Sequence, residues 1–249
     1  MRIINMSNRL DEVSDSATLA ISAKSKQMKR EGRSIIDLSV GEPDFDTPWT
    51  IKEAAFKAIK DGFTKYTPTA GIPELIQAIG DKFRRDNQLD YEPSQIIVSA
   101  GAKQALYNAI LAICNPGDEV IIPQPFWVSY PEQVRLAGAT PILVSTYPED
   151  GFRIGKNEVK KEITSKTKLF ILNSPCNPTG AVYSREDLNQ IAEVIYSHQL
   201  YLIFDEIYEK LIYEGKHWSI ASLGGKIKEK TITVNGLSKT YSMTGWRIG

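Results

Sequence analysis

Hydrophobic and polar positions alternate in two ways after about residue 90. Short apolar runs that end at Pro, Gly or Asn are typical of buried strands, whereas apolar residues spaced three or four apart are typical of amphipathic helices. The first pattern predicts strands over residues 95–99, 118–123, 141–145, 168–173, 201–205 and 231–234. The second predicts helices over residues 103–113, 128–136 and 185–197. Strands that alternate with helices indicate a mostly parallel sheet covered on both faces, a three-layer α/β/α fold.

The helix over residues 185–197 also has a start signal. Ser184 precedes it and Asp187 follows three residues later, a spacing that favours reciprocal capping. The first 90 residues have a different pattern, with an amphipathic segment over 17–30, a short apolar run over 35–40 and a loop rich in Pro and Gly over 41–48. We therefore expect the N-terminal part to be organised separately from the sheet.

The composition limits the class of partner. The 249 residues are 42% hydrophobic and 24% charged, enough for one large domain or for one domain and part of another. Thirty basic residues balance thirty acidic residues. Because such a chain has no net field to attract nucleic acid or an anionic membrane, we expect a small-molecule partner.

Cysteine and histidine offer little to a metal. Cys114 and Cys176 lie far apart without a CxxC spacing, and His198 and His217 are not spaced as metal ligands. We expect two reduced thiols and no metal site. Residues 1–6 lack the apolar core of a signal peptide, and no later run approaches the ~18 apolar residues of a membrane span, so we expect a cytoplasmic protein.

Candidate chemistry is concentrated near the end of the chain. The segment SKTYSMTGWR, residues 238–247, places Lys239 among small and polar residues with Arg247 eight positions later. An imine bond to a cofactor needs an unprotonated amine and small neighbours that admit a flat ring. Arg247 could bind a phosphate group through two parallel hydrogen bonds. These two residues therefore indicate a phosphorylated, ring-shaped cofactor.

Two further blocks precede this segment. NSPCNPTG occupies residues 173–180, and DEIY occupies residues 205–208 after a buried apolar run. With the Ser-Lys block, in this order, the chain resembles the class I/II aminotransferases, pyridoxal-phosphate (PLP) enzymes of fold type I, from about residue 8 to its last residue. Among subgroups it looks like the bacterial aspartate aminotransferases of the gamma subgroup, of which some also accept prephenate.

The resemblance implies a division of the chain. Residues 1–45 correspond to an N-terminal arm and the first part of a small domain, and residues 46–249 correspond to a PLP-binding large domain that is incomplete at its C-terminal end. The rest of the small domain would follow residue 249, so we expect a truncated chain. Such a chain should expose apolar surface, behave poorly in solution and lack full activity.

A phosphate site is predicted at the turn before residue 103. Free amides at a helix N-terminus suit a phosphate dianion, and the resemblance places Gly101, Ala102 and Lys103 in the PLP phosphate cradle. Ser238 and Arg247 would complete this cradle. An ordinary strand-to-helix turn is the alternative for this segment taken alone.

The resemblance also assigns contacts to the cofactor ring. Asp205 would pair with the protonated ring nitrogen, while Tyr208 and Asn177 would donate hydrogen bonds to the phenolic oxygen. Trp127 would stack on the ring face, and Tyr66 would reach the phosphate of a neighbouring subunit, which implies a homodimer. Without the resemblance, a helix-capping aspartate, a turn asparagine and a core tryptophan are the alternatives.

Catalysis and substrate binding follow from the same resemblance. Lys239 would hold PLP covalently and then act as the general base that moves a proton between the substrate and the cofactor. The substrate would contact Gly41, Trp127 and Asn177, with Lys103 on its distal carboxylate. The main arginine for the α-carboxylate would lie in the part of the small domain that follows residue 249.

We therefore expect transamination of L-aspartate with 2-oxoglutarate to give oxaloacetate and L-glutamate. Prephenate-active members carry a lysine before their Ser-Ala-Thr, where this chain has Ser14 and Asp15. Transamination of prephenate or other aromatic substrates stays an alternative, as does a carbon–sulfur lyase or an aminocyclopropane carboxylate synthase. A PLP-binding regulator without catalytic activity is a further alternative, although no basic helix-turn-helix segment precedes the region.

Overall fold

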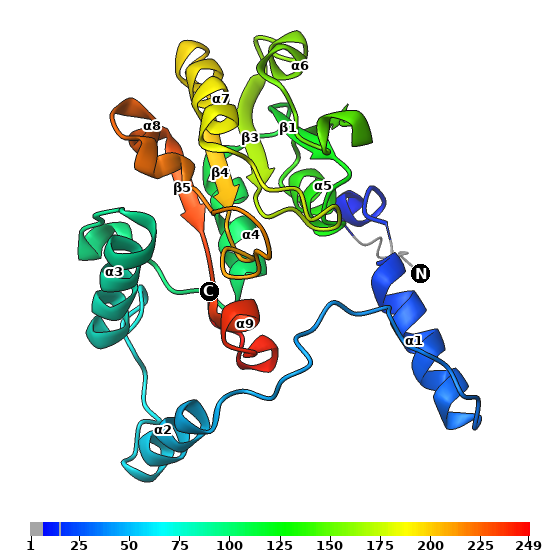
Figure 1. Ribbon diagram of the computed structural model, residues 1–249, viewed down its shortest axis with the longest axis vertical. Coiled ribbons are helices and arrows are strands. Elements are labelled where there is room, and N and C mark those ends of the chain that lie inside the picture. The colour runs from blue at the N-terminus through cyan, green and yellow to red at the C-terminus, as the bar shows by residue number, and fades with distance from the viewer. Residues whose placement is uncertain (1–6, 15) are drawn as a thin grey trace, which may run out of the picture.

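The computed structural model describes residues 7–14 and 16–249. Its centre is a five-stranded sheet in the order β2-β1-β3-β4-β5, and every neighbouring pair is parallel (Figure 1). The strands are β1 (Glu119–Gln124), β2 (Thr140–Ser145), β3 (Thr167–Asn173), β4 (Tyr201–Asp205) and β5 (Thr231–Val234). The predicted parallel sheet is confirmed, and these five strands begin and end within one residue of the predicted positions.

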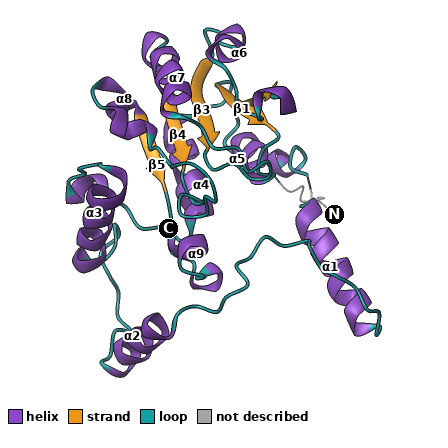
Figure 2. Cartoon of the chain, viewed as in Figure 1, coloured by secondary structure: helices purple, strands orange, loops and turns teal. Residues whose placement is uncertain are grey.

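Helices precede and connect these strands (Figure 2). They are α1 (Ala17–Arg30), α2 (Trp49–Lys60), α3 (Pro73–Asn87), α4 (Ala102–Ile113), α5 (Ser129–Leu136), α6 (Lys156–Lys161), α7 (Arg185–Ser197), α8 (Lys226–Lys230) and α9 (Leu237–Thr240). The helices predicted over 103–113, 128–136 and 185–197 and the amphipathic segment over 17–30 are all helical. None of the helices in residues 7–14 and 16–249 is both long and apolar enough to cross a bilayer.

Both faces of the sheet are buried. On one face, Phe170 of β3 and Phe204 of β4 belong to a core that includes Ile191 of α7. On the other face, Ile203 of β4 belongs to a core with Ile110 of α4. Alternate residues of one strand thus enter different cores, because successive side chains in a strand point to opposite faces. This arrangement confirms the three-layer α/β/α fold.

The strand register decides which residues meet at the carboxyl edge of the sheet. Asn173 of β3 is paired with Asp205 of β4, and Asp205 is paired with Val234 of β5. From β1 the chain continues outward to β2, whereas β3, β4 and β5 lie on the other side of β1. Ligands of such sheets bind beyond the carboxyl ends where the strand order reverses.

The prediction of a strand over residues 95–99 was wrong. Gln95 ends a short 3-10 helix, Pro93–Gln95, and the residues that follow are extended without belonging to the sheet. The Val98 amide donates to the Ala70 carbonyl at 2.8 Å, and Ser99 exchanges two backbone hydrogen bonds with Gly249, at 2.7 and 3.0 Å. The last two residues of this segment are therefore bonded to Ala70 and Gly249 and not to a neighbouring strand of the sheet.

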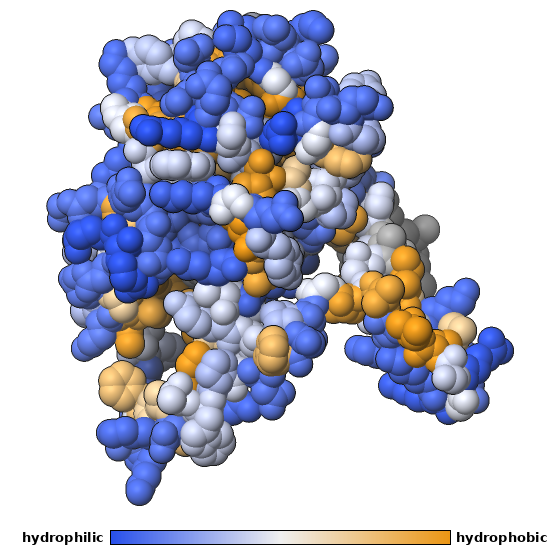
Figure 3. Space-filling view, viewed as in Figure 1, coloured by the Kyte–Doolittle hydropathy of each residue, from blue (hydrophilic) through white to orange (hydrophobic). Residues whose placement is uncertain are grey.

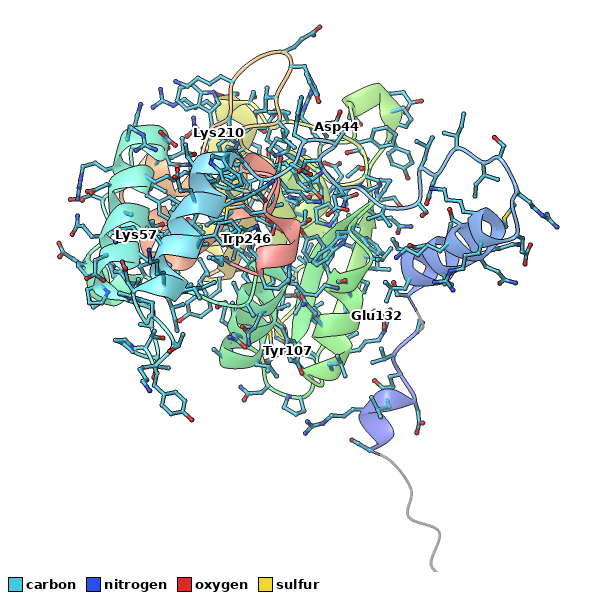
Figure 4. The ribbon with its side chains drawn as sticks, turned by 90° about the horizontal axis from the view of Figure 1, so that it is seen from below. Asp44, Lys57, Tyr107, Glu132, Lys210 and Trp246 are labelled. Atoms are coloured by element: carbon cyan, nitrogen blue, oxygen red, sulfur yellow. The ribbon has the colours of Figure 1, made fainter. Side chains whose placement is uncertain are left out.

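The N-terminal segment projects from this body. Helix α1 and the residues that lead from it to α2 extend away from the sheet (Figure 1). Its apolar side chains are solvent-exposed, with Ile36 at 91% and Leu38 at 90%, and Figure 3 shows orange residues along this arm. The arm is joined to the body where the Ser14 amide donates to Glu132 on α5 at 3.0 Å (Figure 4).

Helix α7 has the capping arrangement that its sequence predicts. The Ser184 hydroxyl oxygen accepts a hydrogen bond from the Asp187 amide at 3.1 Å, and an Asp187 carboxylate oxygen accepts one from the Ser184 amide at 2.9 Å. Two backbone donors that have no partner inside the helix are satisfied in this way. The cap fixes the start of the helix that covers one face of β3 and β4.

We expect Ser184→Ala to lower the free energy of unfolding by about 1 kcal/mol, because the Asp187 amide loses its acceptor. Urea denaturation followed by circular dichroism measures this change. Ser165→Ala, at an exposed loop position, is the matched control and should have almost no effect. Equal effects of the two substitutions would contradict the role of the cap.

Candidate functional site

Four strand ends place the predicted residues at one edge of the sheet. Trp127 follows β1, Asn177 follows β3, Asp205 ends β4 and Lys239 lies in α9 after β5. In Figure 1 the arrows of β3, β4 and β5 point toward α9. The parallel strand directions therefore bring residues from a span of more than a hundred positions to one place.

Asp205 is a buried carboxylate, only 3% exposed. It accepts a hydrogen bond from the Tyr130 hydroxyl at 2.7 Å and one from the Ile207 amide at 3.1 Å. In residues 7–14 and 16–249, no lysine, arginine or histidine forms an ion pair with it. Burial raises the pKa of Asp205 to about 6, against the two hydrogen bonds, which lower it. Residues 207–210 form turns and not a helix, so Asp205 is not a helix cap.

Asn173 links Asp205 to the asparagine loop. Its side-chain amide donates to the Asp205 carbonyl at 2.9 Å, and its side-chain oxygen accepts from the Asn177 amide at 2.7 Å. The Asn177 side chain in turn donates to the Tyr208 hydroxyl at 3.2 Å. Asn177 and Tyr208, which were predicted to contact the same oxygen, are thus brought together.

Lys239 faces this pair. Its ammonium nitrogen lies 5.6 Å from the centre of the Tyr208 ring and donates a hydrogen bond to the Gly41 carbonyl. Burial lowers the pKa of Lys239, and the nearby Glu42 carboxylate opposes this effect. Because Lys239 is half-buried beside Tyr208 and Gly41, the structure does not fit a lysine that simply lies on a surface loop.

Arg247 lies against the turn that begins α4. A Cβ atom added to Gly101, whose φ is +80°, would stand 2.3 Å from the Arg247 Nη2 atom. Arg247 donates to the Thr244 carbonyl at 2.7 Å and, in the described part of the chain, forms no ion pair with a carboxylate. Gly101 has no side chain to cap the amides of Ala102 and Lys103. A guanidinium and a helix N-terminus are together suited to a phosphate.

One detail of the predicted cradle differs. The Gly101 amide donates to the Ser99 carbonyl at 2.7 Å, so it is already used within the turn. The contribution of Gly101 is therefore close approach to Arg247, while Ala102 and Lys103 supply the first amides of α4. Ser238 is buried on the first turn of α9, next to Lys239.

Trp127 and Lys103 are also brought together. The Lys103 ammonium lies 5.1 Å from the centre of a Trp127 ring, and the Tyr130 ring meets Trp127 at 5.3 Å with an interplanar angle of 84°. Trp127 is only partly buried at the edge of the core, which leaves ring surface available to a ligand. Tyr66, in contrast, is almost fully exposed on the loop between α2 and α3, away from these contacts.

Comparison with known proteins identifies the family. Residues 33–249 match the sequence profile of "Aminotransferase class I and II". The chain belongs to this family. Its members depend on PLP.

Individual relatives are similar over nearly the whole chain. An aspartate aminotransferase of Bacillus sp. (strain YM-2) is 52% identical over 98% of this chain and 62% of its own length. An aspartate/prephenate aminotransferase of Thermus thermophilus is 50% identical over 98% of this chain and 63% of its own length. A solved aspartate aminotransferase from Thermus thermophilus with maleate has a TM-score of 0.96 at 49% identity, over 99% of this chain and 64% of that one. This chain therefore spans somewhat less than two thirds of these aminotransferases.

Sequence reasoning assigned no role to two residues of this cluster. Tyr130 was predicted only as part of a helix, although it lies one helical turn after Trp127. Asn173 was predicted as the last residue of a strand and the first residue of the NSPCNPTG block, without a role of its own, and its contact with Asp205 depends on the register of β3 and β4. The i, i+3 spacing could have suggested Tyr130, whereas no local signal predicts the contact between Asn173 and Asp205.

A second polar cluster was also not expected. His217 lies with Glu206 and Glu209, and one ligand atom of each is within 4.8 Å of the others. The Asn87 side chain of α3 donates to Glu206 at 2.9 Å and to Glu209 at 2.8 Å, and the Lys82 ammonium contacts Glu209. Because these donors already bind the carboxylates, the cluster connects α3 to the turn after β4.

The raised pKa of Asp205 predicts a pH-dependent stability. Between its ordinary pKa of 3.8 and its folded value of about 6, the folded chain binds more protons than the unfolded chain. Stability from this group is therefore greatest below pH 4 and is lost as the pH rises through about 6, by about 3 kcal/mol in total. Urea denaturation without added ligand, compared between wild type and Asp205→Asn, should show this difference. Parallel pH profiles for the two proteins would contradict the assignment.

Proposed function

We propose that this chain binds PLP at the carboxyl edge of its sheet and forms part of an enzyme that transfers an amino group from an amino acid to a 2-oxo acid. The observation that supports this most directly is the buried carboxylate of Asp205, which has no cationic partner among the described residues, in the cluster that also contains the half-buried amine of Lys239. A buried carboxylate that lacks a cation favours a positively charged ligand group.

Each polar part of PLP has a suitable partner here. The protonated ring nitrogen would pair with Asp205, and the phenolic oxygen would accept hydrogen bonds from Asn177 and Tyr208. The Lys239 amine would hold the cofactor at its aldehyde carbon, with the aldehyde oxygen leaving as water. The phosphate would lie between Arg247 and the first amides of α4, with Ser238 beside it. Trp127 would cover one face of the ring.

When bound, PLP supplies an electron sink for the bond that breaks at the substrate α-carbon. The protein's own residues then have three tasks. Asp205 keeps the ring nitrogen protonated, Tyr208 and Asn177 stabilise negative charge on the phenolic oxygen, and Lys239 takes and returns the proton as general base. Burial favours the neutral Lys239 amine that this proton transfer needs.

Aspartate is the amino donor that we propose, with 2-oxoglutarate as acceptor and oxaloacetate and L-glutamate as products. Relatives at about 50% identity are named aspartate aminotransferases, and one solved relative is described with maleate, a dicarboxylate. Lys103, beside Trp127, is a cation suited to the distal carboxylate. The Gly41 carbonyl accepts a hydrogen bond from Lys239, which supports our proposal that Gly41 contacts the substrate.

Prephenate is a second candidate substrate. Several relatives are named aspartate/prephenate aminotransferases. Asp15, which stands where prephenate-active members carry a lysine, lies outside the described residues. The amide of the adjacent Ser14 donates a hydrogen bond to Glu132. The names of the relatives give no support to a lyase, a cyclopropane carboxylate synthase or a regulator.

We further propose that the enzyme is a cytoplasmic homodimer with residues 1–45 as an arm and part of a small domain, and that nucleic acids and membranes are not its partners. The exposed apolar arm and the exposed Tyr66 support the dimer, because both present side chains that a neighbouring subunit could cover. Tyr66 would contribute to the phosphate site of that neighbour. Equal numbers of basic and acidic residues support a small-molecule partner.

Substitution of Lys239 tests the cofactor site. We expect the wild-type chain to give the visible absorption band of lysine-bound PLP, and aspartate should bleach this band with recovery on adding 2-oxoglutarate. Lys239→Ala should abolish the band because no amine remains to bond the aldehyde. Lys65→Ala, in an exposed loop, is the control. Folded wild-type protein without the band would refute PLP binding. A band that does not respond to aspartate would leave PLP binding standing and would point either to the α-carboxylate arginine expected after residue 249 or to a different substrate.

The phosphate site has its own test. Gly101→Ala should displace the Arg247 guanidinium and weaken PLP binding about tenfold, the loss of roughly one charge-assisted hydrogen bond. Gly117→Ala is the matched control, because Gly117 has a φ of +91° but no atom near its added Cβ. Both substitutions strain the backbone, so only Gly101→Ala should change the PLP dissociation constant in a fluorescence titration. Equal weakening by both would reject this role of Arg247.

A further inference from the structure

Tyr130 contacts the Asp205 carboxylate and has no role in the proposed reaction as described above. Its hydroxyl donates to Asp205 at 2.7 Å, and the side chain is 3% exposed. The other hydrogen bond to the Asp205 carboxylate comes from the Ile207 amide, two residues along the same segment. Among the described residues, Tyr130 is therefore the donor that connects this carboxylate to a different element of the fold.

The position of Tyr130 is fixed on several sides. It belongs to the first turn of α5, where its amide donates to the Trp127 carbonyl at 3.0 Å, and its ring stands at 84° to the Trp127 ring. Gln133, one turn later, donates to the Lys103 carbonyl at 2.9 Å in the first turn of α4. Helix α5 thus contacts the nitrogen-pairing carboxylate, the stacking aromatic and the phosphate-binding turn.

We propose that Tyr130 is a positioning residue that holds Asp205 as an ionised carboxylate facing the cofactor's ring nitrogen. Through its contact with Trp127, it would also fix the position of this carboxylate relative to the Trp127 ring. This inference rests on the proposed PLP site. A neutral hydroxyl suits the task, because it stabilises the carboxylate without supplying a positive charge that would compete with the ring nitrogen. A lysine or arginine in its place would repel the protonated ring.

The other groups that act on this pair come from two segments. Glu206 and Tyr208 lie in the turn after β4, and Cys176 lies in the loop after β3. Burial raises the pKa of Tyr130 well above its usual value, with the Asp205 charge acting in the same direction. The tyrosine therefore stays protonated and remains a donor wherever Asp205 is ionised.

Tyr130→Phe removes the hydroxyl and keeps the ring beside Trp127. In the full chain without PLP, we expect the Asp205 pKa to rise by about one unit, a tenfold change in its protonation constant. Carboxyl ¹³C NMR measures this pKa, with the signal assigned by its loss in Asp205→Asn. With ¹⁵N-labelled PLP bound, the ring-nitrogen shift should move toward that of a neutral pyridine, because a more basic carboxylate takes more of the shared proton.

Tyr183→Phe is the matched control, since Tyr183 is equally buried and its hydroxyl accepts from the Ile154 amide at 2.9 Å, away from Asp205. It should destabilise the fold without changing either NMR signal. If Tyr130→Phe does not fold, a fluorinated tyrosine at position 130 keeps the shape and strengthens the donor, and should lower the Asp205 pKa. An unchanged Asp205 pKa, or the same change in Tyr183→Phe, would overturn the proposal. Failure of the wild type to bind PLP would instead refute the proposed function, and the ligand-free titration would still decide the role of Tyr130.

Discussion

The site depends on one buried carboxylate, Asp205, that pairs with no cationic side chain in the part of the chain that the structure describes. Asp205 ends a strand whose side chains fill both cores, so its position is fixed by the packing of the whole sheet. A carboxylate in that place is unfavourable unless hydrogen bonds or a positive ligand stabilise it. Tyr130 and the Ile207 amide supply two hydrogen bonds, and a protonated ring nitrogen would supply the charge. The ionised Asp205 carboxylate that would bind the cofactor therefore lowers the stability of the folded chain as long as no ligand is bound.

Neighbouring strands extend the effect of this residue. The side chain of Asn173 holds the Asp205 carbonyl and the Asn177 amide, so β3 and β4 position the asparagine loop together. Helix α5 joins Asp205 to Trp127 and to the first turn of α4. A shift of one strand would thus move the ring-binding groups as a set, which is why a rigid parallel sheet is a suitable support for this chemistry.

Contacts between distant parts of the chain complete the site. Gly41 accepts a hydrogen bond from Lys239, Glu42 accepts one from Thr244, and Thr47 donates to the Ser242 carbonyl at 2.5 Å. The indole of Trp246, which is labelled in Figure 4, donates to the Thr47 hydroxyl at 3.1 Å. The loop at the start of the body therefore lies on the segment that carries Lys239 and Arg247. Its own sequence predicted only an irregular loop, because hydrogen bonds over this separation leave no local pattern.

The sequence by itself determined the five strands of the sheet, the helices α1, α4, α5 and α7, the α7 cap and the order of the PLP-binding blocks. Strand and helix periodicity are local consequences of burial, and motif residues such as Lys239 and Asp205 are recognised because several blocks follow one another in a fixed order. Only the tertiary structure decided that Val98 and Ser99 are bonded to Ala70 and Gly249 in place of a neighbouring strand. It also decided that the Gly101 amide is used within its turn, and that Tyr130 and Asn173 hold Asp205. It also brought His217 to Glu206 and Glu209. These contacts depend on strand register and on helix packing across the sheet, and neither is encoded in the spacing of residues along the chain.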